Sequence, residues 1–150
     1  MPADVIGGVA VSAQDYDPAR CLARIDPNNP KQLAGNVRAQ FRPVTGRAWD
    51  GRPYFVGVAT MVGPNGPTCQ WGGGDGNEHL GTVSSHHPGG AHVAFADGSA
   101  SFINESIDTG DATAVDIPDP GGRESPWGTW GALGSMSGHE SVSMSTLNLQ

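Results

Sequence analysis

The chain has 150 residues, including 23 glycines and 12 prolines, and 37% of its residues are hydrophobic while only 15% are charged. Glycine and proline break helices and favour turns, so this composition predicts short strands joined by loops, in a single domain over residues 1–150. The formal net charge of −7 with only eight Lys and Arg leaves no basic face that could displace counterions from phosphates, which argues against nucleic acid as a partner.

The sequence predicts no membrane span and no export signal. No apolar run approaches the eighteen or so residues that a spanning helix requires. The first residues, MPADVIGGVAVSAQDYD, lack both the positive start and the long apolar stretch of a secretory signal peptide.

The first elements predicted in chain order are a short apolar strand within residues 4–13 and a helical turn or two after it. Asp17 can cap a helix by accepting from its free backbone N–H groups, and Pro18 suits the first helical position. Pro27 and Pro30 cannot continue a helix, so we expect it to stop before them.

Residues 40–62 alternate well enough to predict two strands around an Asp50-Gly51 turn. Residues 63–81 are rich in glycine, proline and asparagine and are predicted as loop.

The segment SSHHPGGAHVAFADGSASFINESID, residues 84–108, carries the strongest local signal in the chain. Two apolar stretches flank Asp97-Gly98, a pair that favours the tight turn of an antiparallel hairpin. A two-residue turn there places His92 opposite Ile103. It also places Val93, Phe95 and Phe102 on one apolar face, and leaves His92 on the other.

The remainder of the chain is predicted to be acidic loop followed by Gly- and Ser-rich segments, with one strand at residues 140–144. The fold class expected overall is mainly β, or α+β at most, built from short antiparallel strands, hairpins and long Gly/Pro-rich loops.

Cys21 and Cys69 lack the CxxC spacing of zinc ribbons and thioredoxin-like sites. As a disulfide they would close a loop of 47 intervening residues, worth about 4 kcal/mol in the chain-entropy treatment. The alternative is a pair of buried, unpaired thiols.

Histidines and carboxylates allow several metal sites to be considered. Imidazoles combined with a carboxylate suit zinc, copper or iron, and a glycine-rich loop with hard oxygen ligands suits calcium. The spacing matches no established ligand motif, so a structural role is the competing interpretation and no cofactor is expected. The candidate ligands are His86, His87, His92, Asp75, Glu78 and His79. Within the hairpin segment, a His87–Glu105 hydrogen bond is the structural alternative.

Two further site types have candidate residues. Glycoside hydrolysis needs paired carboxylates, and Asp97, Glu105 and Asp108 lie close together in the sequence. Exposed tryptophans can stack on sugars, for which Trp71, Trp127 and Trp130 are the candidates, although filling the core is the competing role.

HPGGAHVAFADGS, in which nine residues separate His87 from Asp97-Gly98, resembles the signature of the prepilin-type H-X9-DG proteins. These are pilin-like secreted proteins of otherwise unknown function, abundant in planctomycete-type bacteria. The resemblance extends in order to WDGRPYFVGVATMVGPNGPTC, FINESID and SPWGTWGALGSMSGHESVS, which together cover about two thirds of the chain.

This resemblance implies a pilin-like globular half without the leader and N-terminal helix, in which residues 84–108 are the signature hairpin. It also implies an exported, extracytoplasmic or cell-surface structural module with no enzymatic activity, whose partners are pilin-like subunits or further copies of itself. The alternatives are a secreted metal-dependent enzyme or glycoside hydrolase acting on polysaccharide, and a carbohydrate-binding module.

Overall fold

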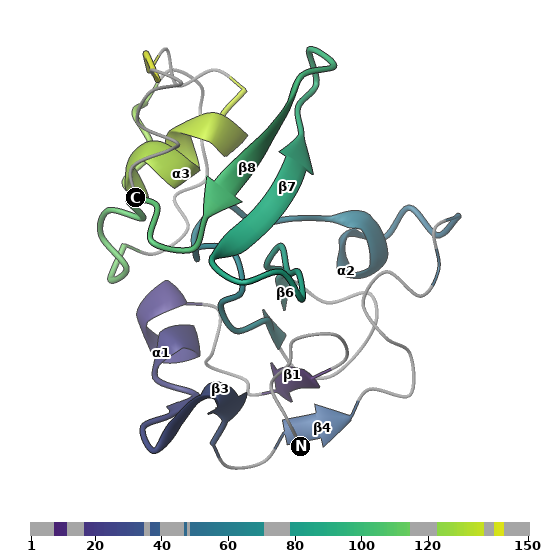
Figure 1. Cartoon of the computed structure of the whole chain (residues 1–150), viewed down its shortest axis with the longest axis vertical. Helices are drawn as coiled ribbons and strands as arrows, with labels where there is room; N and C mark the ends of the chain where they lie inside the picture. Colours follow the sequence, from purple (N-terminus) through teal and green to yellow (C-terminus); the bar gives the residue numbers. More distant parts are fainter. Residues whose placement is uncertain are drawn as a thin grey trace.

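The computed structural model describes residues 8–11, 17–34, 37–39, 47, 49–70, 79–114, 123–136 and 140–142. Its strands are short and mostly antiparallel, and loops and small helices connect them, so the fold is mainly β as the composition predicts. Figure 1 shows the hairpin β7–β8 and helix α3 at one end of the molecule, and α1, β1, β3 and β4 at the other. Among the described residues, no helix is long and apolar enough to cross a membrane.

The lower sheet has the strand order β4-β1-β5-β6. Strand β1 (Gly8–Val11) pairs antiparallel with β4 (Val37–Ala39) and parallel with β5 (Cys69–Gln70). Strand β5 in turn pairs antiparallel with β6 (His79–Leu80), so the segment 63–81, predicted as loop, contributes two short strands.

Helix α1 (Pro18–Leu22) begins as predicted, with proline at its first position and Asp17 as its cap. The Asp17 carboxylate accepts from the Ala19 backbone N–H at 2.8 Å. The two strands that follow, β2 (Ile25–Asp26) and β3 (Asn29–Leu33), form a small antiparallel hairpin that the sequence pattern did not indicate.

Of the two strands predicted around Asp50-Gly51, the second is wrong, and the first falls largely on residues 40–46 and 48, which lie outside the described residues. Helix α2 (Pro53–Val56) lies where the second strand was predicted. Proline fits the first turn of a helix, and the Asp50 carboxylate accepts from the Arg52 backbone N–H at 3.3 Å, which turns the chain into the helix rather than into a strand.

The upper hairpin pairs β7 (Gly90–Ala94) with β8 (Ala100–Asn104), but its predicted register is wrong by one residue. The turn holds three residues, Ala96 to Gly98, closed by Gly98 N–H donating to Phe95 O at 3.0 Å. Gly98 has φ +85°, the left-handed conformation that ends a type I turn of this length.

This register exchanges the two faces of β8. His92 lies opposite Phe102, and Ala91 lies opposite Ile103. Ile103 is therefore fully buried beside Ala91, whereas Phe102 lies on the same outer face as the exposed His92. Val93 and Phe95 pack against the core as predicted.

Helix α3 (Gly128–Gly134) lies in a Gly-rich stretch that was predicted as loop. Its glycines follow a three-residue spacing that allows close packing. A side chain at Gly131 would overlap Ser125 and Trp127, and one at Gly134 would overlap Thr60. Residues 140–142 are not a strand, and residues 143–144 of the predicted strand lie outside the described residues.

Buried apolar residues form a lower and an upper cluster in the described part of the chain. The lower cluster contains Cys21, Leu33, Val62, Cys69 and Leu80. The upper cluster contains Ile103, Ile107 and Trp130 beneath the hairpin and α3. Cys21 and Cys69, both 0% exposed, form the disulfide that was one of the two predicted alternatives, with Cα atoms 5.9 Å apart. It ties α1 to β5 across the lower cluster.

Candidate functional site

A cleft of about 760 Å³ lies near the open end of the upper hairpin. Its walls come from β3, from the loop 62–68 and from residues 85–89, which lead into β7. Glu105, which directly follows β8, also lines the cleft. Its volume lies within the range of roughly 300–1,000 Å³ that ligand sites occupy, so this is the candidate binding site.

Asn65 holds the wall of this cleft together. Its backbone has φ +64°, a left-handed conformation that asparagine tolerates better than most residues. Its backbone N–H donates to Val83 O at 2.8 Å, its Oδ1 accepts from Ser85 N–H at 2.8 Å, and its Nδ2 donates to Glu105 Oε2 at 3.3 Å. Asn65 lies in the segment that the sequence predicts as loop. The tripeptide Pro-Asn-Gly around it is the signal that would have indicated a fixed turn.

The rim of the cleft is polar and exposed to solvent. Lys31 contributes from β3, His86 and His87 from the loop before β7, and Glu105 from the end of β8, where its backbone N–H donates to Gly89 O at 2.9 Å. The predicted His87–Glu105 hydrogen bond is replaced, because the Glu105 carboxylate accepts from Asn65 and the His87 backbone N–H donates to Ser85 Oγ at 3.1 Å.

The structure does not bring the predicted metal ligands together. Among the residues described, no group of three or more His, Cys, Asp or Glu side chains is placed to hold a metal ion. His86 and His87 lie at the cleft, His92 lies on the outer face of β7, and His79 is buried in β6. The candidates Asp75 and Glu78 lie outside the described residues.

His79 and His92 have distinct structural surroundings. Burial lowers the pKa of His79 below its ordinary value, and the Gly57 backbone opposes part of this effect. A Cβ at Gly81 would lie 2.5 Å from His79 Nε2, so the imidazole packs directly on that glycine. His92 contacts Phe102 edge-to-face, with ring centroids 5.2 Å apart.

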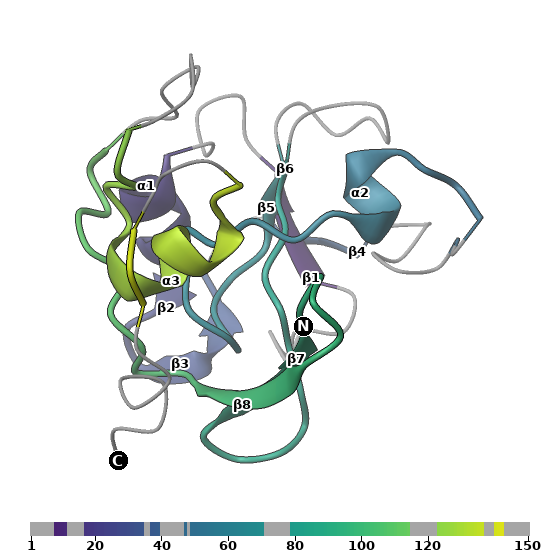
Figure 2. The same cartoon turned by 90° about the horizontal axis from the view of Figure 1, so that it is seen from above.

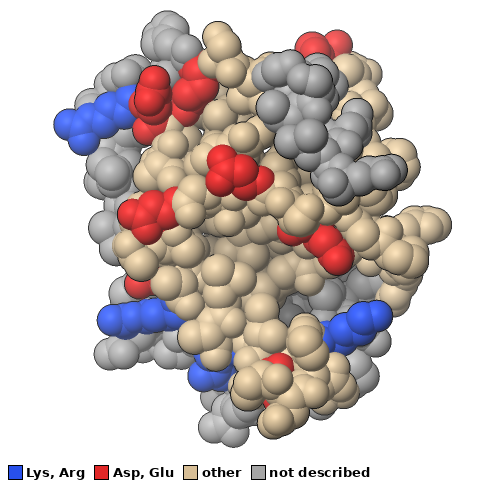
Figure 3. Space-filling model, turned by 60° about the vertical axis from the view of Figure 1, so that its left-hand side comes forward, with Lys and Arg blue, Asp and Glu red and all other residues tan. Residues whose placement is uncertain are grey.

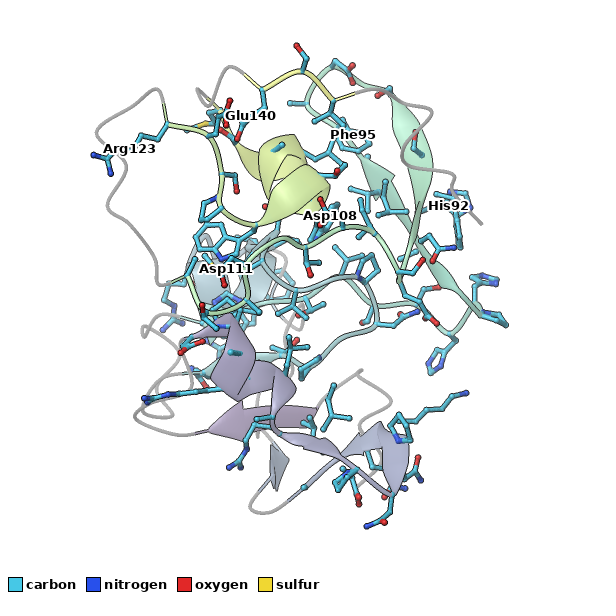
Figure 4. The ribbon with its side chains drawn as sticks, turned by 90° about the vertical axis from the view of Figure 1, so that its left-hand side faces the viewer. His92, Phe95, Asp108, Asp111, Arg123 and Glu140 are labelled. Atoms are coloured by element: carbon cyan, nitrogen blue, oxygen red, sulfur yellow. A yellow bond between two sulfur atoms is a disulfide. The ribbon has the colours of Figure 1, made fainter. Side chains whose placement is uncertain are left out.

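Two of the three candidate catalytic carboxylates, Asp97 and Asp108, accept from backbone N–H groups of separate segments, and the third, Glu105, accepts from the Asn65 side-chain amide. Asp97 at the hairpin tip accepts from Ser99 N–H at 2.8 Å, and its hydrogen bonds to Ser99 lower its pKa. Asp108 accepts from Gly110 N–H at 2.9 Å and from Thr129 N–H at 3.1 Å, which lowers its pKa and fixes the start of α3. Figure 4 shows Asp108 beside α3 and well apart from His92.

Paired-carboxylate hydrolysis needs one carboxyl group whose pKa is raised so that it can act as the acid. Asp97 and Asp108 have lowered pKa values, and the third candidate, Glu105, bonds to Asn65. The described residues therefore use these carboxylates to shape loops. Figure 3 shows acidic side chains scattered over this face, two of them side by side near its upper left, and basic side chains mainly near its edges.

The prediction that Trp130 stacks on a sugar is wrong. This tryptophan is 1% exposed and its Nε1–H donates to Val62 O at 2.9 Å, so it fills the upper cluster and is not available for stacking. Trp127 is half-buried, and Trp71 lies outside the described residues. Among the described tryptophans the exposed one is Trp49, at 88%, which was not among the candidates.

Trp49 stands in a charged turn that sequence analysis also missed. The Asp50 carboxylate accepts from Arg52 Nε at 2.8 Å and lies 3.5 Å from Arg47 Nη1, and its hydrogen bonds with Arg52 hold its pKa far below its usual range. Both guanidinium groups lie 5.2 Å from the ring centroid of the buried Phe55.

The comparison with protein families matches the model of the protein of unknown function DUF1559 over residues 10–110. The match spans most of the chain, including α1, both cysteines and the upper hairpin. Neither the curated proteins nor the solved structures give a significant match. The chain therefore belongs to the DUF1559 family.

Proposed function

We propose that this member of the DUF1559 family is an exported, pilin-like structural module without enzymatic activity, working outside the cytoplasm among subunits of its own kind. The observation that carries this proposal is the buried disulfide between Cys21 and Cys69. Structural disulfides persist in oxidising compartments and are rare where thiols are kept reduced.

The hydrogen bonds and positions of the candidate carboxylates and histidines support the proposal that the protein has no catalytic activity. The candidate carboxylates accept backbone or amide hydrogen bonds near their own loops, and two of them have lowered pKa values. The candidate histidines in the described part of the chain are divided among the cleft, the outer face of β7 and the interior of β6.

The first experiment reads the state of the cysteines in cells that produce the protein. Cells are lysed in acid, free thiols are alkylated with a mass tag, and the protein is weighed with and without prior reduction. We expect no tag before reduction and two tags after it. Cys21→Ser is the matched control, because it leaves one thiol that must be tagged without reduction. Two tags on the unreduced wild-type protein would contradict export into an oxidising compartment.

The second experiment addresses catalysis. The purified, oxidised protein is analysed for transition metals and is assayed against a panel of polysaccharides and chromogenic glycosides. We expect no stoichiometric metal and no bond cleavage. A metal present in equal amount to the protein, or glycoside turnover that is lost in Glu105→Gln, would contradict the proposal and would favour a secreted enzyme.

A further inference from the structure

We infer that Asn65-Gly66 is a site of spontaneous deamidation that the folded, oxidised protein keeps closed, and that its modification permanently releases one wall of the cleft. The modification site consists of the Asn65 side-chain amide and the Gly66 backbone nitrogen, and both residues line the cleft. This inference goes beyond the proposed function and does not depend on the compartment in which the protein works.

The reaction needs no partner other than water. The backbone nitrogen of Gly66 attacks Cγ of Asn65 and forms a five-membered succinimide, while Nδ2 leaves as ammonia with the proton that the backbone nitrogen gives up. Water then opens the ring at either carbonyl carbon, which leaves aspartate or isoaspartate in place of Asn65. Glycine has no side chain to hinder its own nitrogen, which makes this pair reactive. Every other asparagine of the chain precedes a bulkier residue than glycine.

The fold leaves little choice of residue at either position. Asn65 has φ +64°, a conformation that asparagine tolerates better than most residues. A Cβ at Gly66 would overlap Val62 Cγ1 and would lie 2.9 Å from Gly63 O, so the site has room only for glycine. The reactive pair is therefore built into the loop, and its protection has to come from the surrounding structure.

All three reacting groups are engaged in hydrogen bonds. The Gly66 N–H donates to Gly63 O at 3.1 Å, which directs the attacking nitrogen into its own turn. Asn65 Oδ1 accepts from Ser85 N–H at 2.8 Å, and Asn65 Nδ2 donates to Glu105 Oε2 at 3.3 Å. Because these partners belong to three segments of the chain, the amide and the nitrogen stay apart until the bonds break.

The loop that carries the pair depends on the disulfide. Figure 2 shows the chain after α2 running across the molecule toward α3 before it turns back to β5. Near the end of this path, Pro67 O lies 3.5 Å from Cys21 Sγ and accepts from Thr82 Oγ1 at 2.8 Å. Val62, at the start of the loop 62–68, packs with both cysteines in the lower cluster. Reduction should therefore loosen both ends of the loop and expose the reactive pair.

The modified residue no longer fits its place. Aspartate lacks the Nδ2–H donor and faces the Glu105 carboxylate. Isoaspartate lengthens the backbone where a Cβ at Gly63 would already lie 2.9 Å from Glu105 O. Either product unties the loop 62–68 from the end of β8. Since neither product returns to asparagine, a molecule that has once opened is permanently marked.

Peptide mapping of the full protein tests the inference. The oxidised protein is kept in mildly alkaline buffer, either folded or in guanidinium, and is digested in acid so that digestion causes no deamidation. Mass spectrometry then measures the loss of the Asn65 amide. The folded protein should react at least about 30-fold more slowly than the denatured chain, because three hydrogen bonds of ordinary strength must break. Reduction without denaturant should accelerate the reaction at least about tenfold.

Two variants identify the group that holds the amide. Glu105→Ala removes the acceptor of Asn65 Nδ2 and should accelerate deamidation of the folded, oxidised protein by about fivefold, the effect of one hydrogen bond. Glu105→Gln is the matched control, because it retains an acceptor oxygen and should react like the wild type. Circular dichroism and an intact disulfide verify that both variants are folded.

Asn65→Asp reproduces one product of the reaction. At neutral pH it should lower the thermal midpoint by about 5 °C, because a hydrogen bond is replaced by two facing carboxylates. Adding Glu105→Gln places an amide donor opposite the new carboxylate. The double variant should recover most of the lost midpoint, since the two residues then form the same bond with their roles exchanged.

A folded protein that deamidates as fast as the denatured chain would overturn the inference. A faster reaction in the folded state would overturn it as well, because the bonds from Ser85 and to Glu105 would then activate the amide. The same holds for a rate that reduction or Glu105→Ala leaves unchanged, and for a wild-type midpoint in Asn65→Asp. The state of the cysteines in cells is read separately, so each of these outcomes leaves the export proposal standing.

Discussion

At the level of single residues, the aspartates that the structure describes shape turns and loop starts. Their carboxylates accept from the backbone N–H two residues further on, a local bond that stabilises turns and loop starts. Such bonds keep a carboxylate ionised and occupied, which is the opposite of what an acid catalyst needs. The pairs that form this bond are Asp17 with Ala19, Asp26 with Asn28, Asp50 with Arg52, Asp97 with Ser99, Asp108 with Gly110, and Asp111 with Thr113.

These bonds predict a loss of stability in acid. The pKa values of Asp97, Asp108 and Asp111 are lowered in the folded state, chiefly by hydrogen bonds to Ser99, Gly110 and Thr113. The stability that these three carboxylates contribute is fully present above the unfolded pKa of about 3.9. It is lost as the pH falls from there through their lower pKa values in the folded protein. Thermal unfolding between about pH 5 and pH 2 measures the decline.

Asp108→Ala isolates one of these carboxylates. We expect it to cost about 1–2 kcal/mol at neutral pH, because Gly110 and Thr129 lose their acceptor, and to flatten the acid-induced decline. Asp108→Asn retains one acceptor oxygen and should cost less. An unchanged acid profile in Asp108→Ala would show that this bond does not act in solution.

His79 predicts a second pH dependence. Burial lowers its pKa in the folded state, so the unfolded chain binds a proton more readily. Stability should therefore be complete above the unfolded pKa of about 6.5 and should fall as the pH drops below it toward the folded value.

Thermal midpoints measured between about pH 8 and pH 5 test this, with His79→Gln expected to remove the slope. His92→Gln is the control, since His92 is exposed on the outer face of β7 and should keep the wild-type profile. A slope that survives in His79→Gln would assign it to another group.

At the level of secondary-structure elements, the two ends of the upper hairpin require glycine for different reasons. Gly98 has φ +85° with open space around it, whereas a Cβ at Gly90 would overlap the Ile103 carbonyl oxygen and approach the Phe102 ring. Gly98→Ala should therefore cost about 1 kcal/mol, the strain of a left-handed alanine.

Gly90→Ala should cost distinctly more, because the two strands must separate to admit a methyl group. Chemical denaturation of both variants measures the difference, and Gly98→Asn should recover most of the stability lost in Gly98→Ala because asparagine tolerates this backbone conformation. Equal losses in Gly90→Ala and Gly98→Ala would contradict the tight pairing at the open end of the hairpin.

Local signals in the sequence were sufficient for some of these elements. Asp17 and Pro18 define the start of α1, and Asp97-Gly98 locates the hairpin, because caps and turns depend on a few adjacent residues. The predicted hairpin turn has two residues, one fewer than the turn in the structure. Since side chains alternate along a strand, that single residue exchanged Phe102 and Ile103 between the faces.

Other elements depend on distant contacts that no local pattern reveals. The glycines of α3 predict a loop by propensity, yet Gly131 and Gly134 bring the helix against Trp127 and Thr60. Their spacing at every third residue was the available signal. Among the described residues, the polar candidates for metal and carboxylate sites lie close along the chain but do not converge in space.

At the level of the whole molecule, the disulfide stabilises a fold whose apolar clusters are small. It joins α1 to β5 inside the lower cluster. Reduction, or the double substitution Cys21→Ser with Cys69→Ser, should cost about 4 kcal/mol by releasing a loop of some fifty residues in the unfolded chain. The thermal midpoint should fall by on the order of 10 °C. A midpoint that does not respond to reductant in the wild type would contradict a structural role for the disulfide.

Trp130 links the lower cluster to the upper one, since it is buried with Ile103 and Ile107 while its indole N–H bonds Val62 O at 2.9 Å. Trp130→Phe keeps an aromatic ring but leaves a buried carbonyl unpaired, at a cost of about 1–3 kcal/mol.

Because the upper cluster packs beneath the hairpin and α3 while the lower cluster surrounds the disulfide, their losses should be separable by amide hydrogen exchange. In Trp130→Phe the amides of β8 should exchange faster while those of β5 and β6 remain protected, and the cysteine double variant should show the reverse. Acceleration of both regions to the same extent in each variant would mean that the clusters unfold as one unit. The upper hairpin and the disulfide-linked sheet would then stabilise each other rather than each closing its own half of the molecule.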